Sequence, residues 1–328
     1  MSHTFSHESL EISHLSLAVP IGGQYVEAVS DVSLLLNAGR VMGLVGESGC
    51  GKSLTAQALL RLGEHQGVKH CAGDVLLGGK SIFAMSESQL RHFRGGQVAM
   101  IFQEPMTALN PVFTVGAQIT EVIRLHLDVN KQTAKKRAIA LLHDVGMAEA
   151  SVLMGQYPDA LSGGMRQRIL IAMAMATNPR FIVADEPTTA LDVSVQKRII
   201  ALLRRLQQQH QQGMLLVTHD FGLVAEMCDD VAVMYAGQIV ERATVHEIFN
   251  HARHPYTRAL MDCRPEIGVR GDMLPVIAGQ VPAPGQYGAG CRFAKRCAFA
   301  DDQCASPIAE NAWHDGTHHA RCVHGDQQ

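Results

Sequence analysis

Hydrophobic and polar residues alternate along the first part of the chain, through EISHLSLAV (residues 11–19) and YVEAVSDVSLLL (residues 25–36). A period of two between Gly-rich turns predicts antiparallel strands. A short, almost wholly apolar run at 41–46 predicts a buried strand, because it is too short to form a helix. Glycines and a lysine follow, and residues 53–62 (SLTAQALLRL) then predict a helix. The chain is thus expected to begin with strands and to continue with a strand, a Gly-rich turn and a helix.

The pattern changes to helical spacing from about residue 115 to 154, which predicts a group of amphipathic helices. Further on, a helix is expected at 163–176, a strand at 181–185, a helix at 193–209 and strands at 214–219 and 231–237. Strands that alternate with helices indicate a mostly parallel, covered sheet. After residue 250 the chain is rich in Pro, Gly, His and Cys without periodicity, which predicts a separate tail. No internal repeat indicates a second copy of the preceding domain.

The charge, the apolar runs and the cysteine count exclude some classes of function. The 328 residues carry a net charge of -3, which argues against a protein that coats nucleic acid. The start lacks the features of a secretory signal, and no apolar run reaches the length of a membrane-spanning helix, so a cytoplasmic location is expected. In that reducing compartment, eight cysteines favour metal or cluster binding over disulfides.

Residues 46–53 (GESGCGKS) fit the pattern GxxxxGK[ST], and they stand between a predicted strand and a predicted helix. In such a loop, glycines let backbone N–H groups turn toward phosphates, the lysine neutralises phosphate charge and the following hydroxyl reaches Mg²⁺. An ordinary Gly-rich turn is the alternative. The predicted nucleotide-binding residues are Gly46, Glu47, Ser48, Gly49, Cys50, Gly51, Lys52, Ser53 and Leu54.

Two carboxylates end the apolar strand at 181–186 (FIVADE). The strand would deliver Asp185 and Glu186 to the edge of the sheet where open α/β folds bind ligands. Asp185 is predicted to hold Mg²⁺, and Glu186 to orient or deprotonate the attacking water. A solvated turn or a helix cap is the alternative for an acidic pair taken alone.

A second anion site is indicated by LSGGM at 161–165, where a serine and two glycines precede a helix. One chain needs only one cradle for a terminal phosphate. The residues Ser162, Gly163, Gly164 and Met165 are therefore predicted to contact ATP that is held by another subunit.

This ordered set of motifs resembles the ATPases of ABC transporters, and among them the oligopeptide, dipeptide and nickel importers. The resemblance covers nearly the whole chain. It implies an α/β fold with a P-loop NTPase core at 1–250, an antiparallel β subdomain and a helical subdomain at about 104–160. It also implies a small irregular C-terminal domain at 251–328, since residues 254–257 (HPYT), 279–282 (GQVP) and the cysteines of the tail are similar to that family's C-terminal domain.

The same resemblance assigns roles to residues outside the two anion sites. Gln103 would sense the γ-phosphate and join Ser53 and Asp185 around Mg²⁺, and His219 would contact the γ-phosphate. Residues 190–192 correspond to the D-loop, which places Asp192 at the nucleotide. Tyr25 is the candidate for stacking on adenine, with an exposed strand tyrosine as the alternative.

Cys291, Cys297, Cys304 and Cys322 follow the spacing C-x5-C-x6-C-x17-C. This spacing alone does not separate zinc, an iron–sulfur cluster and unligated thiols. Some relatives in the resembling family bind a [4Fe-4S] cluster in this domain, and the same is expected here. Cys50, Cys71, Cys228 and Cys263 are expected to be packing residues, and His318 and His319 to be solvated.

The predicted function is binding and hydrolysis of MgATP by one subunit of an ABC importer for peptides, nickel or a metal chelate. The family implies a second, non-identical ATPase, two membrane permeases and an external binding protein, with this chain at the cytoplasmic face of the membrane. Two alternatives remain, a soluble ABC ATPase that acts on nucleic acid or ribosomes and a non-catalytic iron–sulfur regulator. The residues do not identify the transported solute.

Overall fold

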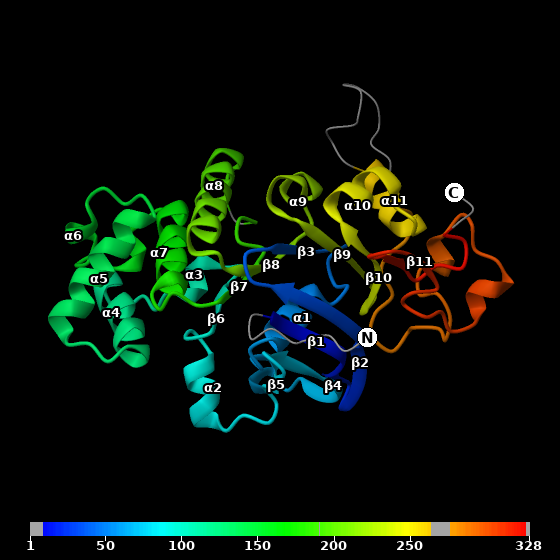
Figure 1. Ribbon diagram of the computed structural model, residues 1–328, viewed down its shortest axis with the longest axis horizontal. Coiled ribbons are helices and arrows are strands. Elements are labelled where there is room, and N and C mark those ends of the chain that lie inside the picture. Colours follow the sequence, from blue (N-terminus) through cyan, green and yellow to red (C-terminus); the bar gives the residue numbers. More distant parts are fainter. Residues whose placement is uncertain (1–8, 190, 264–275, 326–328) are drawn as a thin grey trace. The chain divides into compact units, whose positions relative to one another are not determined.

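The computed structural model describes residues 9–189, 191–263 and 276–325, and these fall into two compact units (Figure 1). The first unit is formed by Met1–Leu36, Val41–Phe83 and Val217–Gln328, and the second by Asn37–Arg40 and Ala84–Leu216. Each unit combines segments that are far apart in the sequence, so long-range contacts build both.

The N-terminal part of the first unit is a four-stranded sheet in the order β2-β1-β4-β5. Its strands are β1 (Ser9–Ile21), β2 (Gln24–Asn37), β4 (Lys69–Leu77) and β5 (Lys80–Ser81). The strand β1 runs antiparallel to β4, and along β1 the side chains of Leu10, Ile12 and Leu15 are buried. The alternation in the sequence thus correctly predicted two strands at this end of the chain.

A second group of strands in this unit has the order β11-β12-β10-β9-β3. These strands are β3 (Val41–Val45), β9 (Asp230–Tyr235), β10 (Gln238–Thr244), β11 (Trp313–Asp315) and β12 (His318–Ala320). The helices are α1 (Lys52–Ala58), α9 (Phe221–Met227), α10 (Val245–His251) and α11 (Pro255–Asp262), with short 3-10 helices η1 (Gly63–Gln66), η3 (Ala294–Arg296) and η4 (Asp302–Ala305). The strand β3 is buried along its length and parallel to β9. The helix α1 ends at Ala58, four residues before the predicted end.

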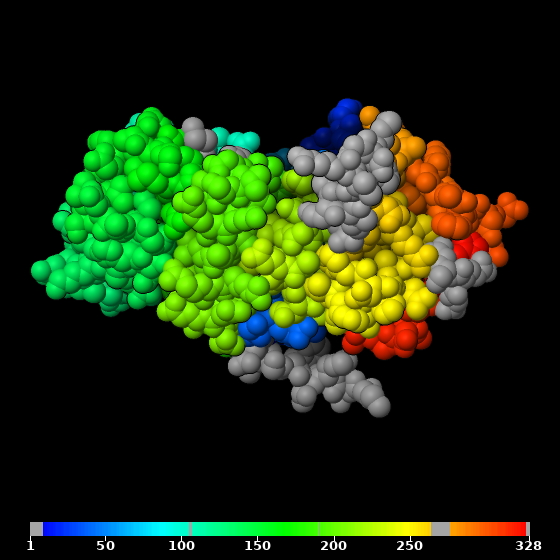
Figure 2. Space-filling model, turned by 90° about the horizontal axis from the view of Figure 1, so that it is seen from above, coloured from blue at the N-terminus to red at the C-terminus, as the bar shows by residue number. Residues whose placement is uncertain are grey.

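The tail packs with the strands and helices of the first unit. The strand β12 pairs with β10, and the Arg321 N–H donates to the Val240 carbonyl oxygen at 2.8 Å. Phe293 from the tail joins Tyr235 and Tyr256 in one buried hydrophobic cluster. The tail (orange to red) lies against α10 and α11 (yellow) in Figure 2. The tail therefore completes the core of the first unit.

The histidine His318 is not solvated, which corrects an expectation from the sequence. It is 3% exposed, and its Nε2 atom lies 2.7 Å from a carboxylate oxygen of the buried Glu241. The backbone N–H groups of Arg253 and His254 donate to the same carboxylate, at 2.6 and 3.0 Å. Because these partners satisfy the carboxylate, Glu241 joins β10 to the start of α11 and to β12.

The second unit contains the parallel strands β6 (Val98–Ile101) and β7 (Phe181–Asp185), with the order β8-β7-β6 where β8 (Gly213–Thr218) adjoins them. Its helices are α2 (Glu87–Phe93), α3 (Pro105–Ala108), α4 (Val115–His126), α5 (Lys131–Asp144), α6 (Ala150–Leu153), α7 (Gly163–Met175) and α8 (Val193–His210), with the 3-10 helix η2 (Pro158–Ala160). The helices α4 to α7 gather into one group in Figure 1. Of these, α4 to α6 lie in the stretch of 115–154 for which the spacing predicted helices. No helix in the described part of the chain is long and apolar enough to cross a membrane.

Candidate functional site

The phosphate loop leaves β3 at Gly46 and passes very close to β9. A Cβ atom at Gly46 would lie 2.2 Å from the Met234 carbonyl oxygen, and the backbone φ of Gly46 is +154°. At Gly51, φ is +108° and a Cβ atom would lie 2.9 Å from the Met234 side chain. Only glycine fits such positions without strain. The Gly237 N–H also donates to the Cys50 carbonyl oxygen at 2.8 Å, so the turn between β9 and β10 holds the loop as well.

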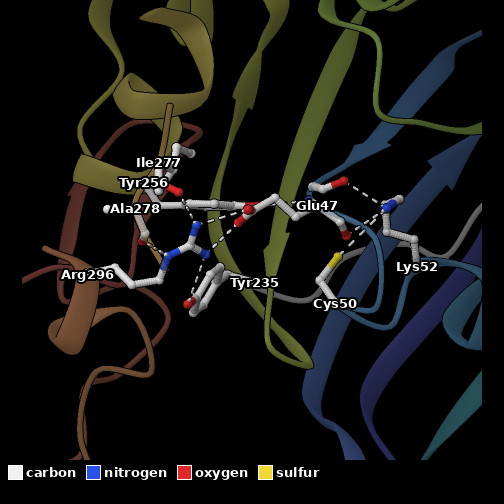
Figure 3. A network of polar contacts seen from close by, with 9 residues as sticks. Glu47, Cys50, Lys52, Tyr235, Tyr256, Ile277, Ala278 and Arg296 are labelled. Atoms are coloured by element: carbon white, nitrogen blue, oxygen red, sulfur yellow. Dashed lines mark hydrogen bonds and ion pairs between the residues drawn. The ribbon is translucent and has the colours of Figure 1, made fainter. Parts of the chain in front are cut away.

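Lys52 stands where this loop enters α1, and its side chain is buried. The ammonium group donates to the carbonyl oxygens of Gly46 at 2.7 Å and Glu47 at 3.0 Å (Figure 3). The loop thus holds a buried cation beside the exposed residues Ser48 and Gly49. Because a buried cation is costly unless it is paired, a phosphate oxygen entering the loop would be a favourable partner for Lys52.

Glu47 has partners that the sequence did not reveal. Its backbone N–H donates to the Tyr256 hydroxyl at 2.9 Å, and its carboxylate accepts two hydrogen bonds from Arg296, at 2.7 and 3.0 Å (Figure 3). The bond with Glu47 is the main reason that the pKa of Arg296 is raised above its usual value. These partners lie 209 and 249 residues away in the chain, so no local pattern could have indicated them.

The strand β7 ends at Asp185, as the sequence predicted, and Glu186 follows it directly. Asp185 is 3% exposed, and Glu186 has a φ of +43°, which is uncommon for a residue with a side chain. The Oε2 atom of Glu186 accepts hydrogen bonds from Gln103 Nε2 at 3.1 Å and from Thr189 Oγ1 at 2.8 Å. The structure therefore brings Gln103 and Glu186 together, and adds Thr189, which the sequence did not indicate. Strained backbone at such a position is typical of functional sites.

The serine–glycine turn lies at the start of α7. The hydroxyl of Ser162 accepts a hydrogen bond from the Met165 N–H at 3.4 Å and caps the helix. A Cβ atom at Gly164 would lie 2.8 Å from a methyl group of Val195 on α8, so the close packing of two helices requires glycine. Ser162 is exposed, and Gly163 and Met165 are half-buried. The turn has a structural role within its own subunit and still presents an exposed hydroxyl.

Asp192 caps α8 by accepting hydrogen bonds from the backbone N–H groups of Ser194 and Val195, at 3.1 and 3.0 Å. The bond from the Ser194 hydroxyl, followed by that from the Val195 N–H, lowers the pKa of Asp192. Residue 190 of the predicted D-loop lies outside the described residues. The roles of Asp192 and of the serine–glycine turn toward nucleotide remain predictions.

His219 follows β8 with an exposed side chain. Tyr25 is 58% exposed on β2, and the ammonium group of Lys69 lies 5.5 Å from the centre of its ring. An exposed ring beside a cation suits stacking on a base. An exposed strand tyrosine would have the same geometry, so both assignments remain predictions.

The four tail cysteines lie near one another in the first unit. The Cys291 N–H donates to the Cys304 carbonyl oxygen at 2.8 Å, and Cys304 and Cys322 are each 7% exposed. Burial raises the pKa of the Cys291 thiol to about 11, and the other three thiols add to that increase. Of the remaining cysteines, Cys50 is buried as expected, whereas Cys71 is exposed and is not a packing residue.

Another group of potential ligands adjoins these thiols. Among the described residues, Asp301, Cys304 and His324 form the one set of three or more potential ligand atoms within 4.8 Å of one another. The His324 Nε2 atom is buried without a hydrogen bond and lies 3.3 Å from an Asp301 oxygen. No three of the four thiols converge that closely. A single tetrahedral Zn²⁺ with Zn–S bonds of about 2.3 Å would draw its thiolates closer together than this.

Comparison with known proteins places these features in a family. The ABC transporter family model matches residues 29–189, and the model of the oligopeptide/dipeptide transporter C-terminal region matches residues 240–304. A protein of Brucella abortus (strain 2308) is 45% identical over 298 residues, covering 91% of this chain and 90% of the relative. A second protein of that strain is 43% identical over 325 residues, covering 96% of each chain. Both relatives are provisionally named peptide import ATP-binding proteins.

Solved structures show the same fold. The chain resembles the dimeric MJ0796, described as a bacterial ABC transporter cassette, with a TM-score of 0.64 at 25% identity over 72% of this chain and 98% of that one. It also resembles cbiO1 of Clostridium perfringens, with a TM-score of 0.62 at 24% identity over 74% of this chain and 90% of that one. Sequence, relatives and fold agree, and the chain belongs to the ABC transporter family of ATP-binding proteins, with the C-terminal region of the oligopeptide/dipeptide transporters.

Proposed function

We propose that this chain binds and hydrolyses ATP as one subunit of an ABC importer that takes up di- or oligopeptides. The observation that best supports ATP binding is the buried ammonium group of Lys52 in a loop whose backbone at Gly46 and Gly51 only glycine can adopt without strain. The names of the relatives and the match to the oligopeptide/dipeptide transporter C-terminal region support peptides as the solute. Nickel or a metal chelate is the alternative cargo.

The residues fit MgATP chemistry. Mg²⁺ prefers oxygen ligands. Side-chain oxygens of Ser53, Asp185 and Gln103 would hold it. The ion supplies charge neutralisation on the transferred phosphoryl group when it is bound. Glu186, fixed by Gln103 and Thr189, is the group that orients or deprotonates the attacking water, and His219 contacts the terminal phosphate.

Hydrolysis at a shared site is the second part of the proposal. The residues 162–164 of one ATPase subunit would contact ATP held by the phosphate loop of another. MJ0796, which has a similar fold, was solved as a dimer bound to ADP and inorganic phosphate. Shifting an open-to-closed equilibrium from 1:99 to 99:1 takes about 5.5 kcal/mol, which a triphosphate contacted from both sides is suited to supply. We further propose that the partner ATPase is a different, homologous subunit.

An exposed apolar surface on the helical group supports docking to membrane permeases. Val112 and Phe113 are 69% and 53% exposed, and Val152 and Tyr157 are 58% and 51% exposed. The Val115 N–H donates to the Gln156 carbonyl oxygen at 2.9 Å, so these two segments lie together. An apolar patch of this kind favours a protein partner over bulk water. We place the chain at the cytoplasmic face of the membrane, with an external binding protein acting through the permeases.

We further propose that the four tail thiols hold a [4Fe-4S] cluster, with one Zn²⁺ ion and unligated thiols as the alternatives, because the spacing of the cysteines resembles that of family members that bind such a cluster. Cys291, Cys297, Cys304 and Cys322 would hold the cluster, which supplies a redox-active or structural iron centre. Anaerobically purified protein is expected to show broad visible absorbance and four iron atoms per chain, lost in Cys297→Ser and kept in the control Cys71→Ser. Colourless protein with one zinc atom that is lost in His324→Ala would instead identify Asp301, Cys304 and His324 as a divalent cation site.

The central test replaces Glu186 by Gln. The variant is expected to bind ATP normally while its turnover falls by about 10²–10³-fold or more, because a group that acts in the transition state is lost. The matched control Glu87→Gln, on the exposed face of α2, should keep normal turnover. Peptide uptake into vesicles with the permeases and binding protein tests the transport role. Normal turnover of Glu186→Gln, or co-purification with nucleic acid in place of permeases, would refute the proposal.

A further inference from the structure

We infer that Arg296, from the C-terminal region, is a positioning residue for the phosphate loop and sets the affinity of the chain for ATP. This inference rests on the proposed nucleotide function of that loop. The side chain of Arg296 is only 5% exposed, and it donates two hydrogen bonds to the Glu47 carboxylate, at 2.7 and 3.0 Å. Such a paired, charge-assisted contact fixes direction as well as distance. The orientation of Glu47 is therefore decided from the far end of the chain.

Glu47 is a point at which three groups meet the loop. Its carboxylate is held by Arg296, its backbone N–H donates to the Tyr256 hydroxyl, and its carbonyl oxygen accepts from Lys52 Nζ at 3.0 Å (Figure 3). A shift of Glu47 would therefore move one of the two oxygens that hold the ammonium group of Lys52. Lys52 is the cation that would bind phosphate. The contacts of Glu47 therefore fix the position of the Lys52 ammonium group before nucleotide binds.

Arg296 is itself held on several sides. Its guanidinium donates to the carbonyl oxygens of Ala278 at 2.8 Å and Ile277 at 3.1 Å, and to the Tyr235 hydroxyl at 3.4 Å. A guanidinium can supply this fork of planar donors, whereas a lysine ammonium cannot. The group thus joins β9, the segment at 277–278 and the phosphate loop through one rigid side chain.

The surrounding aromatic residues make the support stiff. The rings of Tyr235 and Tyr256 lie 4.6 Å apart, and Phe293 packs on both at 5.2 and 5.3 Å. All three side chains are buried, and Tyr235 and Tyr256 each also place a hydroxyl in the polar network of Glu47 and Arg296. A loop held ready in its binding conformation loses less entropy when phosphate arrives. Pre-organisation of this kind should appear as tighter ATP binding.

A purely structural tie is the competing explanation, in which Arg296 only fastens the tail to the rest of the unit. The two explanations differ in what they change. Loss of a structural tie lowers the melting temperature and leaves the affinity of the folded protein for ATP unaltered. Loss of a positioning contact raises the Kd and KM for ATP, while kcat at saturating ATP stays close to normal because the chemical groups remain in place.

The experiment uses the full chain with Arg296→Lys, Glu47→Gln and the double variant. Fluorescent ATP-analogue binding gives the Kd, steady-state hydrolysis gives KM and kcat, and thermal unfolding shows that each variant is folded. The exposed neighbour Lys295→Ala is the matched control and should behave as the wild type. Glu47→Gln keeps the size of the side chain, so it remains informative if Arg296→Lys unfolds.

Each single variant should weaken ATP binding about tenfold with kcat within about twofold of the wild type, as expected for losing a charged hydrogen-bonded pair. The double variant should be no weaker than either single variant, because one interaction is removed in all three. Unchanged Kd in both single variants, or additive losses in the double variant, would overturn the inference. Wild-type protein that does not bind ATP would instead refute the proposed function.

Discussion

Protonation of His254 should destabilise this protein as the pH falls. His254 is 1% exposed at the start of α11, and its Nδ1 atom accepts a hydrogen bond from the Tyr256 N–H at 3.1 Å. Burial lowers the pKa of His254 to about 4, against the opposing attraction of Glu241 and with a smaller contribution from Arg321. The unfolded chain binds this proton near pH 6.5, and the folded chain does so only near pH 4. The resulting stability is thus present above pH 6.5 and is lost as the pH falls toward 4.

The magnitude follows from the two pKa values. Between pH 7 and pH 5 the linkage relation gives a loss of about 2 kcal/mol for this one group, and about 3 kcal/mol once the pH is well below 4. For a chain of 328 residues, 2 kcal/mol corresponds to roughly 3 °C in the melting temperature. A loss of this size is measurable by differential scanning fluorimetry.

The assay compares the change in melting temperature from pH 7 to pH 5 in three proteins. His254→Asn keeps an oxygen that can accept from the Tyr256 N–H but has no titratable ring, so it should lose roughly 3 °C less than the wild type. His65→Asn, at an exposed position, is the control and should lose as much as the wild type. Equal losses in the wild type and in His254→Asn would refute the assignment of this pH dependence to His254.

Three further predictions concern close packing at two glycines and the hydrogen bonds of one buried carboxylate. Gly164→Ala should destabilise the chain by about 1–3 kcal/mol because its methyl group would press on Val195, and Val195→Ala should restore much of the loss in urea unfolding. Gly46→Ala should abolish nucleotide binding, because its Cβ atom would collide with a backbone carbonyl oxygen, whereas Gly288→Ala, with open space around it, should bind nucleotide normally in the same fluorescence assay. Glu241→Gln should cost about 1–3 kcal/mol in urea unfolding, since an amide group cannot accept from all the present donors; an unchanged midpoint would contradict this reasoning.

Most of the candidate functional groups could be predicted from residues that lie close together in the sequence. The glycines and Lys52 of the phosphate loop act within a few residues of each other, so their spacing alone predicted a cation held in a glycine turn. The apolar run before Asp185 similarly predicted a buried strand that ends in carboxylates. Backbone preferences and hydrophobic periodicity act over short distances, which is why such features are readable from the chain.

The contacts that hold those local features in place required the tertiary structure. Nothing near Glu47 in the sequence indicates Arg296, and nothing near Gln103 fixes its bond to Glu186. The irregular composition of the tail did not indicate that β12 pairs with β10 of the first unit or that His318 is buried.

The sequence by itself thus predicted the phosphate loop, the strand before it and the helix after it, because these depend on neighbouring residues. Only the fold decided which distant side chains support the site. A hydrogen bond between residues 249 positions apart depends on how the whole intervening chain packs, and on which buried polar groups remain to be satisfied. Such a contact depends on the packing of the whole chain, so no single segment of the sequence could have predicted it.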